Sequence, residues 1–190
     1  SPVRYKPIDY PSASAEMGVG IQMVYNKRPI CKPEVAEALM IRCLGGGSNI
    51  IGYYMYHGGS TPLQNNGYSQ FFSDEPMGVP KISYDFQAPL GEFGLEAPSF
   101  RPLRVIHNFL ADFQNILAPM QPVMPENTKN MTPDNRDDLR YAARMTQNGE
   151  GFLFLVNTQD HDLNRHDQEN IKIKLNLVGE TITIPNKRGF

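Results

Sequence analysis

Glu16 is the residue of this sequence that is best placed to carry nucleophilic or acid–base chemistry. It is an isolated carboxylate at the end of a run of small residues, 12–17, and glycines follow it at positions 18 and 20. In an α/β barrel, catalytic side chains lie at the carboxyl ends of the strands, where a carboxylate can act as a nucleophile. A surface glutamate that caps a turn would give the same local pattern, so position 16 alone leaves both readings open.

Two further segments combine tyrosines with glycines. Residues 52–60 read Gly-Tyr-Tyr-Met-Tyr-His-Gly-Gly-Ser, and residues 83–94 read Ser-Tyr-Asp-Phe-Gln-Ala-Pro-Leu-Gly-Glu-Phe-Gly. A tyrosine offers an apolar stacking face and a hydroxyl, the combination that sugars require, and glycine lets the backbone approach a ligand closely. Because side chains alternate along a strand, Tyr53, Tyr54 and Tyr56 cannot all face one site, and we expect two of them to be ordinary core contacts.

The three segments together resemble glycoside hydrolases of family 35, the β-galactosidase-type enzymes. In that family a nucleophile strand ends in Thr/Ala-Glu. A Tyr/Phe-Met-Tyr/Phe-His-Gly-Gly-Thr-Asn strand follows a few tens of residues later, and then a Ser-Tyr-Asp-Tyr-Asp-Ala-Pro-Leu-Asp-Glu-Tyr-Gly loop. This chain has Ala15-Glu16, then residues 54–61, then residues 83–94, in the same order. The resemblance covers residues 10–117, and its last motif is the most specific.

The resemblance implies a retaining β-galactosidase-type enzyme in which Glu16 is the nucleophile and Tyr84 contacts the bound galactose. Retaining hydrolysis needs a second carboxyl group, about 5–5.5 Å away, as acid and base. In the family this group belongs to an Asn-Glu pair on an earlier barrel strand, and no such pair precedes Glu16. The isolated chain is therefore expected to be inactive. Similar enzymes act in the periplasm, outside the cell or in lysosomes. The alternative is a non-catalytic carbohydrate-binding or interaction protein derived from such a barrel.

Four positions depart from the family pattern. Ser60 and Thr61 replace Thr-Asn, Gln87 stands where aspartate is common, and Gly91 stands where aspartate often precedes the glutamate. Glu92 matches the family, but we interpret it as a hydrogen-bond acceptor at a loop or helix start rather than as a catalytic group. The predicted chemistry needs no metal and no organic cofactor.

The elements that must position these residues alternate between strand and helix. The sequence predicts a strand over 12–17, a helix over 33–44, a nearly apolar strand over 49–56 and a second helix from Pro102. Its apolar residues recur at spacings of three and four: Leu103, Ile106, Leu110, Phe113 and Leu117. This order indicates an α/β fold with a parallel sheet. With the resemblance, residues 1–118 are expected to form the C-terminal portion, about strands seven and eight, of a TIM (β/α)₈ barrel.

The pattern changes after Ala118. Residues 119–137 contain four prolines and many polar residues, which is typical of a linker. Residues 138–190 then predict the start of an antiparallel β-sandwich-like accessory domain, beginning with a hairpin over 139–156. In its first strand Leu139, Tyr141, Ala143 and Met145 alternate with Arg140 and Arg144.

Composition limits the partners of the chain. The 190 residues are 40% hydrophobic and 20% charged, with a net charge of −2 and no block of like charge. This argues against nucleic acid or an anionic membrane as the main partner, and no apolar run is long enough to span a bilayer. Cys31 and Cys43 flank the first predicted helix, about 18 Å apart, too far for a disulfide. The expected partners are a β-galactoside or related glycan and the remaining part of the barrel, which would cover the unpaired strand edges.

Overall fold

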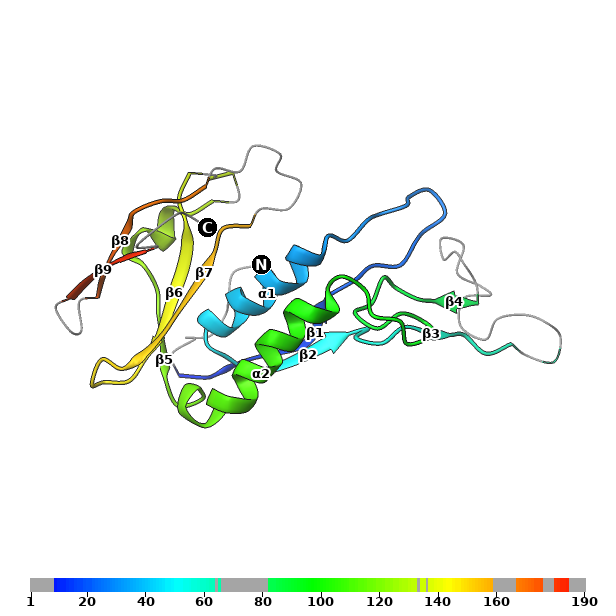
Figure 1. Ribbon diagram of the computed structural model, residues 1–190, viewed down its shortest axis with the longest axis horizontal. Coiled ribbons are helices and arrows are strands. Elements are labelled where there is room, and N and C mark those ends of the chain that lie inside the picture. Colours follow the sequence, from blue (N-terminus) through cyan, green and yellow to red (C-terminus); the bar gives the residue numbers. More distant parts are fainter. Residues whose placement is uncertain are drawn as a thin grey trace. The chain divides into compact units, whose positions relative to one another are not determined.

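The computed structural model describes residues 9–63, 65, 82–132, 134–135, 137–158, 167–175 and 180–184 (Figure 1). The chain divides into two compact units. We call Ser14–Glu37 with Ile51–Asn108 the site unit, and Ser1–Ala13, Ala38–Ile50 and Phe109–Phe190 the sheet unit. Within the described part of the chain, no helix combines the length and the apolar character needed to cross a membrane.

Strand β1 (Ser12–Gly18) and strand β2 (Ser48–Tyr54) form a two-stranded sheet, and helix α1 (Pro33–Gly45) connects them. Both strands run in the same direction (Figure 1), as a strand–helix–strand connection requires. Pro33 suits a first helical position, and Glu34 in the first turn and Arg42 in the last turn complement the helix dipole. The predicted helix over 33–44 and the predicted strand over 12–17 are thus confirmed within one residue.

Helix α2 (Phe100–Leu117) begins two residues before the predicted start at Pro102. Leu103, Ile106 and Leu117 of the predicted apolar stripe are buried. Phe113 keeps 39% of its surface exposed, and it packs against Phe109 at a centroid separation of 5.3 Å. The predicted stripe therefore identifies the core-facing side of α2, with its buried residues towards both ends of the helix.

Strand β2 is shorter than predicted. The sequence predicts a strand over 49–56, but β2 ends at Tyr54 because Met55 has a φ of +66°, which no strand residue adopts. The chain then forms the short strand β3 (Gly59–Ser60), which pairs antiparallel with β4 (Ser83–Tyr84). Met55, in its left-handed conformation, thus ends the strand directly after Tyr53 and Tyr54.

The sheet unit contains a three-stranded antiparallel sheet of β5 (Gln121–Val123), β6 (Arg140–Met145) and β7 (Gly151–Val156). The short helix η1 (Glu126–Asn130) follows β5. The predicted hairpin is confirmed by the register between β6 and β7, which pairs Arg140 with Val156 and Met145 with Gly151. Strands β8 (Ile171–Leu175) and β9 (Glu180–Ile184) form a second hairpin.

Strand β5 lies inside the segment that was expected to be a linker. It pairs with β6 from Gln121 opposite Met145 to Val123 opposite Ala143. Pro122 is tolerated because β5 is at the edge of its sheet, where one side of the strand needs no ladder partner. The proline-rich segment 119–137, which was expected to be a linker, therefore contains the edge strand β5.

Among the described residues, Arg144 of β6 is the largest side chain that is almost completely buried, with 1% of its surface exposed. Its guanidinium donates to Asn49 Oδ1 (2.8 Å) and to four backbone carbonyls, those of Ser48 (3.2 Å), Leu117 (2.9 Å), Ala118 (3.1 Å) and Met120 (3.0 Å). Burial lowers the pKa of the guanidinium, and no described carboxylate pairs with it. Arg144 thus satisfies carbonyls at the end of α2 and at the start of β2.

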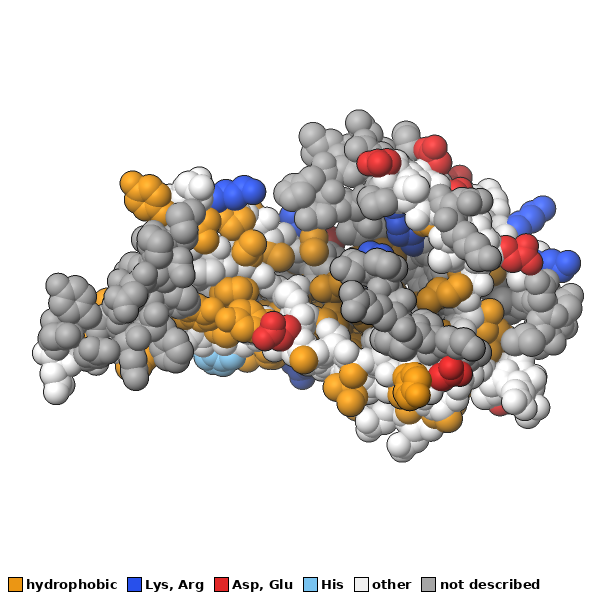
Figure 2. Space-filling model, turned by 180° about the vertical axis from the view of Figure 1, so that it is seen from behind, with side chains coloured by type: hydrophobic (Ala, Val, Ile, Leu, Met, Phe, Trp, Pro, Cys, Tyr) orange, Lys and Arg blue, Asp and Glu red, His pale blue; other side chains and the backbone are white. Residues whose placement is uncertain are grey.

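Several exposed side chains of β1 and β2 are apolar. Ala13, Ala15, Ile50 and Tyr54 are exposed, Ile50 by 63% and Tyr54 by 38%. Figure 2 shows further hydrophobic side chains (orange) at the surface. Large exposed apolar surfaces usually mark a contact with another part of a protein or with a partner.

Candidate functional site

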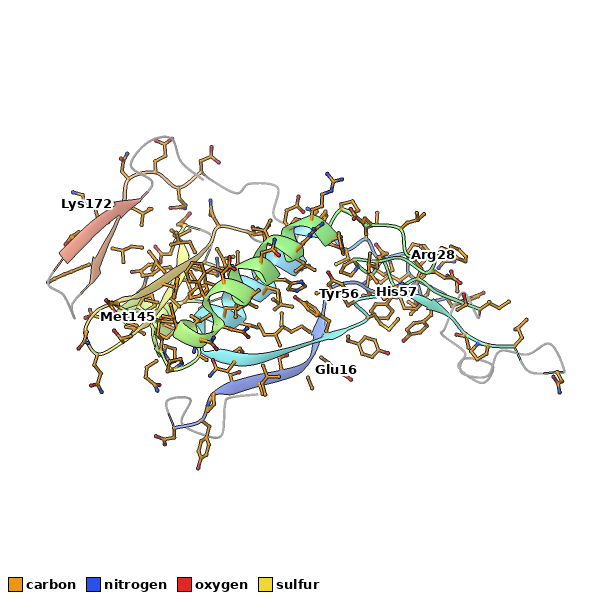
Figure 3. All side chains as sticks on the ribbon, turned by 60° about the horizontal axis from the view of Figure 1, so that its bottom comes forward. Glu16, Arg28, Tyr56, His57, Met145 and Lys172 are labelled. Carbon is orange, nitrogen blue, oxygen red and sulfur yellow. The ribbon has the colours of Figure 1, made fainter. Side chains whose placement is uncertain are left out.

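Glu16 lies at the carboxyl end of β1, and its side chain is exposed. No described residue forms a hydrogen bond or an ion pair with its carboxylate. Figure 3 shows Glu16 and Tyr56 near the same ends of the neighbouring strands.

Glycine at position 52 brings β1 and β2 unusually close together. A Cβ at Gly52 would lie 2.5 Å from the carbonyl oxygen of Ala15, closer than real Cβ atoms approach. Glu16 follows Ala15 directly, and Tyr54 lies two residues beyond Gly52, about 7 Å along the strand. Glu16 and Tyr54 are therefore at the same end of two adjacent strands.

Tyr84 is joined to Tyr54 and Phe86 in a cluster of three aromatic residues. The hydroxyls of Tyr54 and Tyr84 are 2.7 Å apart. Phe86 stacks on Tyr84 with ring centroids 5.4 Å apart and meets the edge of Tyr54 at 5.3 Å. The sequence motifs contain Tyr54 and Phe86, but only the folded chain shows that they belong with Tyr84.

Burial, and to a smaller extent the hydrogen bond with Tyr54, raise the pKa of Tyr84 to about 12. A raised pKa means that the neutral phenol persists to higher pH than usual. The Tyr84 hydroxyl therefore remains protonated at neutral pH and can both donate and accept a hydrogen bond.

The other two tyrosines of the second motif have structural contacts. The Tyr53 hydroxyl lies 2.6 Å from Nε2 of His107 on α2, and Tyr56 packs against the same histidine at a centroid separation of 5.7 Å. Burial lowers the pKa of His107 and raises that of Tyr53, so both groups are neutral at pH 7. Two of the three tyrosines thus have ordinary structural contacts, as expected, but strict alternation would have grouped Tyr54 with Tyr56. The positive φ of Met55 breaks the alternation, so that Tyr56 joins Tyr53 and Tyr54 meets Tyr84.

The loop after β1 touches the loop that carries Tyr84. The N–H of Ile21 donates to the carbonyl of Phe86 at 2.7 Å. A Cβ at Gly20 would lie 2.2 Å from that carbonyl oxygen and 3.0 Å from the carbonyl oxygen of Gln87. Glycine is thus required at position 20 by a close approach of two backbone segments.

We expect Gly20→Ala to destabilise the protein by about 1–3 kcal/mol, because the added methyl group overlaps a backbone oxygen that has little room to move. Gly18→Ala is the matched control, since a Cβ at Gly18 meets nothing within 4 Å. Urea unfolding of the two variants measures the difference. Equal midpoints for both variants would contradict the close approach at Gly20.

Glu92 is held by serines on two paired strands. Its carboxylate accepts hydrogen bonds from the hydroxyls of Ser60 on β3 and of Ser83 on β4 (2.6 Å for Ser83), and these two serines are directly paired. Its N–H donates to Oδ1 of Asp85 at 2.7 Å. These contacts agree with the interpretation of Glu92 as a loop hydrogen-bond acceptor.

Two cavities of about 280 and 470 Å³ lie in the sheet unit, between β6 and the segment after β5. Arg42 and Arg140 contribute to the smaller cavity, and Lys172 and Lys174 contribute to the larger one. Neither cavity is lined by Glu16 or by the aromatic cluster. Over the described ranges, no three His, Cys, Asp or Glu side chains gather in a way that could hold a metal ion.

A comparison with models of known protein families finds no match to the chain, and a comparison with curated proteins finds no matching sequence. The link to glycoside hydrolase family 35 therefore depends on the residues and motifs described above.

Proposed function

We propose that this chain is the nucleophile-bearing part of a retaining β-galactosidase-type glycoside hydrolase. In this proposal, residues 1–118 belong to the C-terminal portion of a (β/α)₈ barrel, and residues 138–190 begin an accessory β-domain. The observation that supports the function best is the contact between the hydroxyls of Tyr84 and Tyr54, 2.7 Å apart, because Tyr54 ends strand β2, which pairs with the strand that carries Glu16. Catalytic groups of such barrels gather at the carboxyl ends of the strands.

Each residue has a defined part in the proposed reaction. The ionised carboxylate of Glu16 attacks the anomeric carbon of a β-galactoside and forms a C–O bond as the bond to the leaving oxygen breaks. A carboxylic acid from another part of the barrel gives its proton to that oxygen and later takes a proton from water. Water then attacks the anomeric carbon and releases Glu16, so the β-configuration is retained. Tyr84 and Tyr54 supply hydroxyls for the sugar, and Phe86 supplies an apolar surface.

The proposal accounts for the exposure of Glu16. In a closed barrel, one face of each strand points inward, towards the strands of the opposite wall. The exposed Ile50 of β2 would then contact the remaining part of the barrel, and Glu16 would line its open end. The remaining part of the barrel is thus the proposed partner, and the isolated chain is expected to be inactive.

A second candidate is a carbohydrate-binding protein without catalysis. It is favoured by the fact that the aromatic cluster of Tyr54, Tyr84 and Phe86 is complete within this chain, whereas hydrolysis needs a second carboxyl group. Both candidates bind a β-galactoside, but only the enzyme consumes it.

The test is proton NMR of the complete protein with an aryl β-galactoside. We expect β-galactose to form first and to convert slowly to the α-anomer, because two successive inversions retain the configuration. Binding without any product would favour the second candidate. Initial formation of α-galactose would rule out Glu16 as a nucleophile.

A further inference from the structure

Gln87 connects the loop after β1 to the loop after β4. Its side-chain amide makes three hydrogen bonds, all with backbone groups of segment 21–31. It donates to the carbonyls of Ile21 (3.1 Å) and Pro29 (2.9 Å), and it accepts from the N–H of Cys31 (3.1 Å). The Gln87 amide therefore uses both N–H donors and its carbonyl acceptor to bind the two ends of segment 21–31.

Segment 21–31 is also held internally. Val24 and Lys27 form a two-way backbone pair, with N–H to carbonyl distances of 3.2 and 3.1 Å. The guanidinium of Arg28 donates to the carbonyls of Val24 (2.6 Å) and Tyr25 (3.2 Å). Because its middle is cross-linked in this way, fixing the two ends at Gln87 fixes the segment as a whole.

The backbone around Gln87 is in a conformation that non-glycine residues rarely adopt. Phe86 has a φ of +60° and Gln87 a φ of +52°. A non-glycine residue with such a φ is strained and persists only where surrounding contacts hold it. The N–H of Ile21 bonds to the Phe86 carbonyl at 2.7 Å, and Oδ2 of Asp85 accepts from the Gln87 N–H at 3.2 Å. The strained turn and segment 21–31 thus stabilise each other.

These contacts lie between the two groups that the proposed reaction must align. Ile21 is five residues after Glu16, and Phe86 is two residues after Tyr84. Glu16 itself has no described hydrogen bond that would fix its strand end. Besides the pairing of β1 with β2, the contacts through Gly20, Ile21 and Gln87 therefore set the position of that strand end relative to Tyr84.

We infer that Gln87 is a positioning residue for the proposed galactosidase reaction: it holds the end of β1, with the nucleophile Glu16, in register with the Tyr84 loop. The inference rests on the proposed function. Gln87 does not touch the sugar, and it acts through segment 21–31. It departs from the aspartate that is common at this position in the resembling family, and an aspartate is too short to make the same three bonds.

Gln87→Glu in the complete protein tests the inference. Glutamate has the same size and keeps the acceptor for Cys31, but it replaces the two donors with an oxygen facing the carbonyls of Ile21 and Pro29. We expect kcat to fall about 10- to 100-fold, as a misplacement of about 1 Å can produce. The inhibition constant for galactose should change less than about threefold, because the aromatic cluster stays in place.

Gln22→Glu is the matched control. Gln22 lies in the same segment, and its amide makes one long hydrogen bond, 3.3 Å to the carbonyl of Ser83. Gln22→Glu introduces the same negative charge as Gln87→Glu but removes only this one long bond. Its kcat and its galactose inhibition constant should therefore stay within about threefold of those of the protein without substitutions. Amide hydrogen exchange at Ile21 and Cys31 should accelerate in the Gln87 variant only.

The outcomes separate this inference from the proposed function. If the complete protein without any substitution does not hydrolyse β-galactosides, both the proposed function and this inference are wrong. An active protein in which Gln87→Glu leaves kcat unchanged, or shifts kcat and galactose affinity equally, would overturn the positioning role alone. If that variant fails to fold, Gln87→Met, which adds no charge, is expected to give the same separation of kcat from galactose affinity.

Discussion

Glu16→Gln is expected to abolish turnover of β-galactosides by the complete protein, with a loss of kcat on the order of 10⁴-fold or more. Glutamine has nearly the same size and hydrogen-bonding reach, but its amide is too weak a nucleophile to form the glycosyl–enzyme bond. Galactose should bind almost as before, because Tyr54, Tyr84 and Phe86 are untouched. Steady-state kinetics and galactose inhibition measure the two effects separately.

Glu92→Gln is the matched control for this prediction. It is the same substitution in the same unit, at a carboxylate that already accepts hydrogen bonds from Ser60 and Ser83. Replacing this carboxylate should lower the free energy of unfolding by about 1 kcal/mol and should leave turnover intact. Turnover that survives Glu16→Gln, or that disappears with Glu92→Gln instead, would contradict the assignment of Glu16.

Arg144→Met should cause the largest loss of stability, about 3–5 kcal/mol. The substitution fills much of the same space but leaves the carbonyls of Ser48, Leu117, Ala118 and Met120 and the side-chain oxygen of Asn49 without their buried donor. The carbonyls at the end of α2 have no helical partner of their own, so their loss is not compensated. The loss of stability would be measured as a lower midpoint of urea unfolding and as faster amide hydrogen exchange in β6.

Arg140→Met on the same strand is the control for Arg144. Arg140 is only half-buried, and its guanidinium donates to the carbonyls of the exposed Thr132 (3.3 Å) and the half-buried Asn135 (2.8 Å). We expect its replacement to cost about 1 kcal/mol. If both variants unfold at the same urea concentration, the buried carbonyl cluster contributes little to stability.

The sequence predicts elements well where local chemistry decides them. Pro33 and the glycines after residue 44 mark the ends of α1, and the turn at residues 147–149 separates β6 from β7. The end of β2 escapes prediction because Met55 is held in a left-handed conformation by its surroundings rather than by its own preference. Strand β5 is missed because Pro122 argues against a strand unless the strand is known to be at an edge.

Tertiary contacts decide most of the candidate site. Strand alternation would group Tyr54 with Tyr56 and set Tyr53 apart, but the left-handed Met55 groups Tyr53 with Tyr56 and leaves Tyr54 to meet Tyr84. Arg144 alternates with apolar residues in the sequence just as Arg140 does, and nothing local shows that it alone is buried, where it donates to the carbonyls at the end of α2. The three hydrogen bonds of Gln87 join residues that are 56 to 66 positions apart in the sequence, so no local sequence pattern predicts them.

The central claim is that Glu16 forms a covalent bond with the sugar, and the most direct measurement is mass spectrometry of the complete protein after reaction with a 2-deoxy-2-fluoro-β-galactoside that has a good leaving group. The fluorine slows the second step, so the glycosyl–enzyme accumulates. The account predicts one added fluorogalactosyl group on the peptide that contains Glu16. Label on a different carboxylate, or no label while the unmodified substrate is turned over with retention, would contradict it.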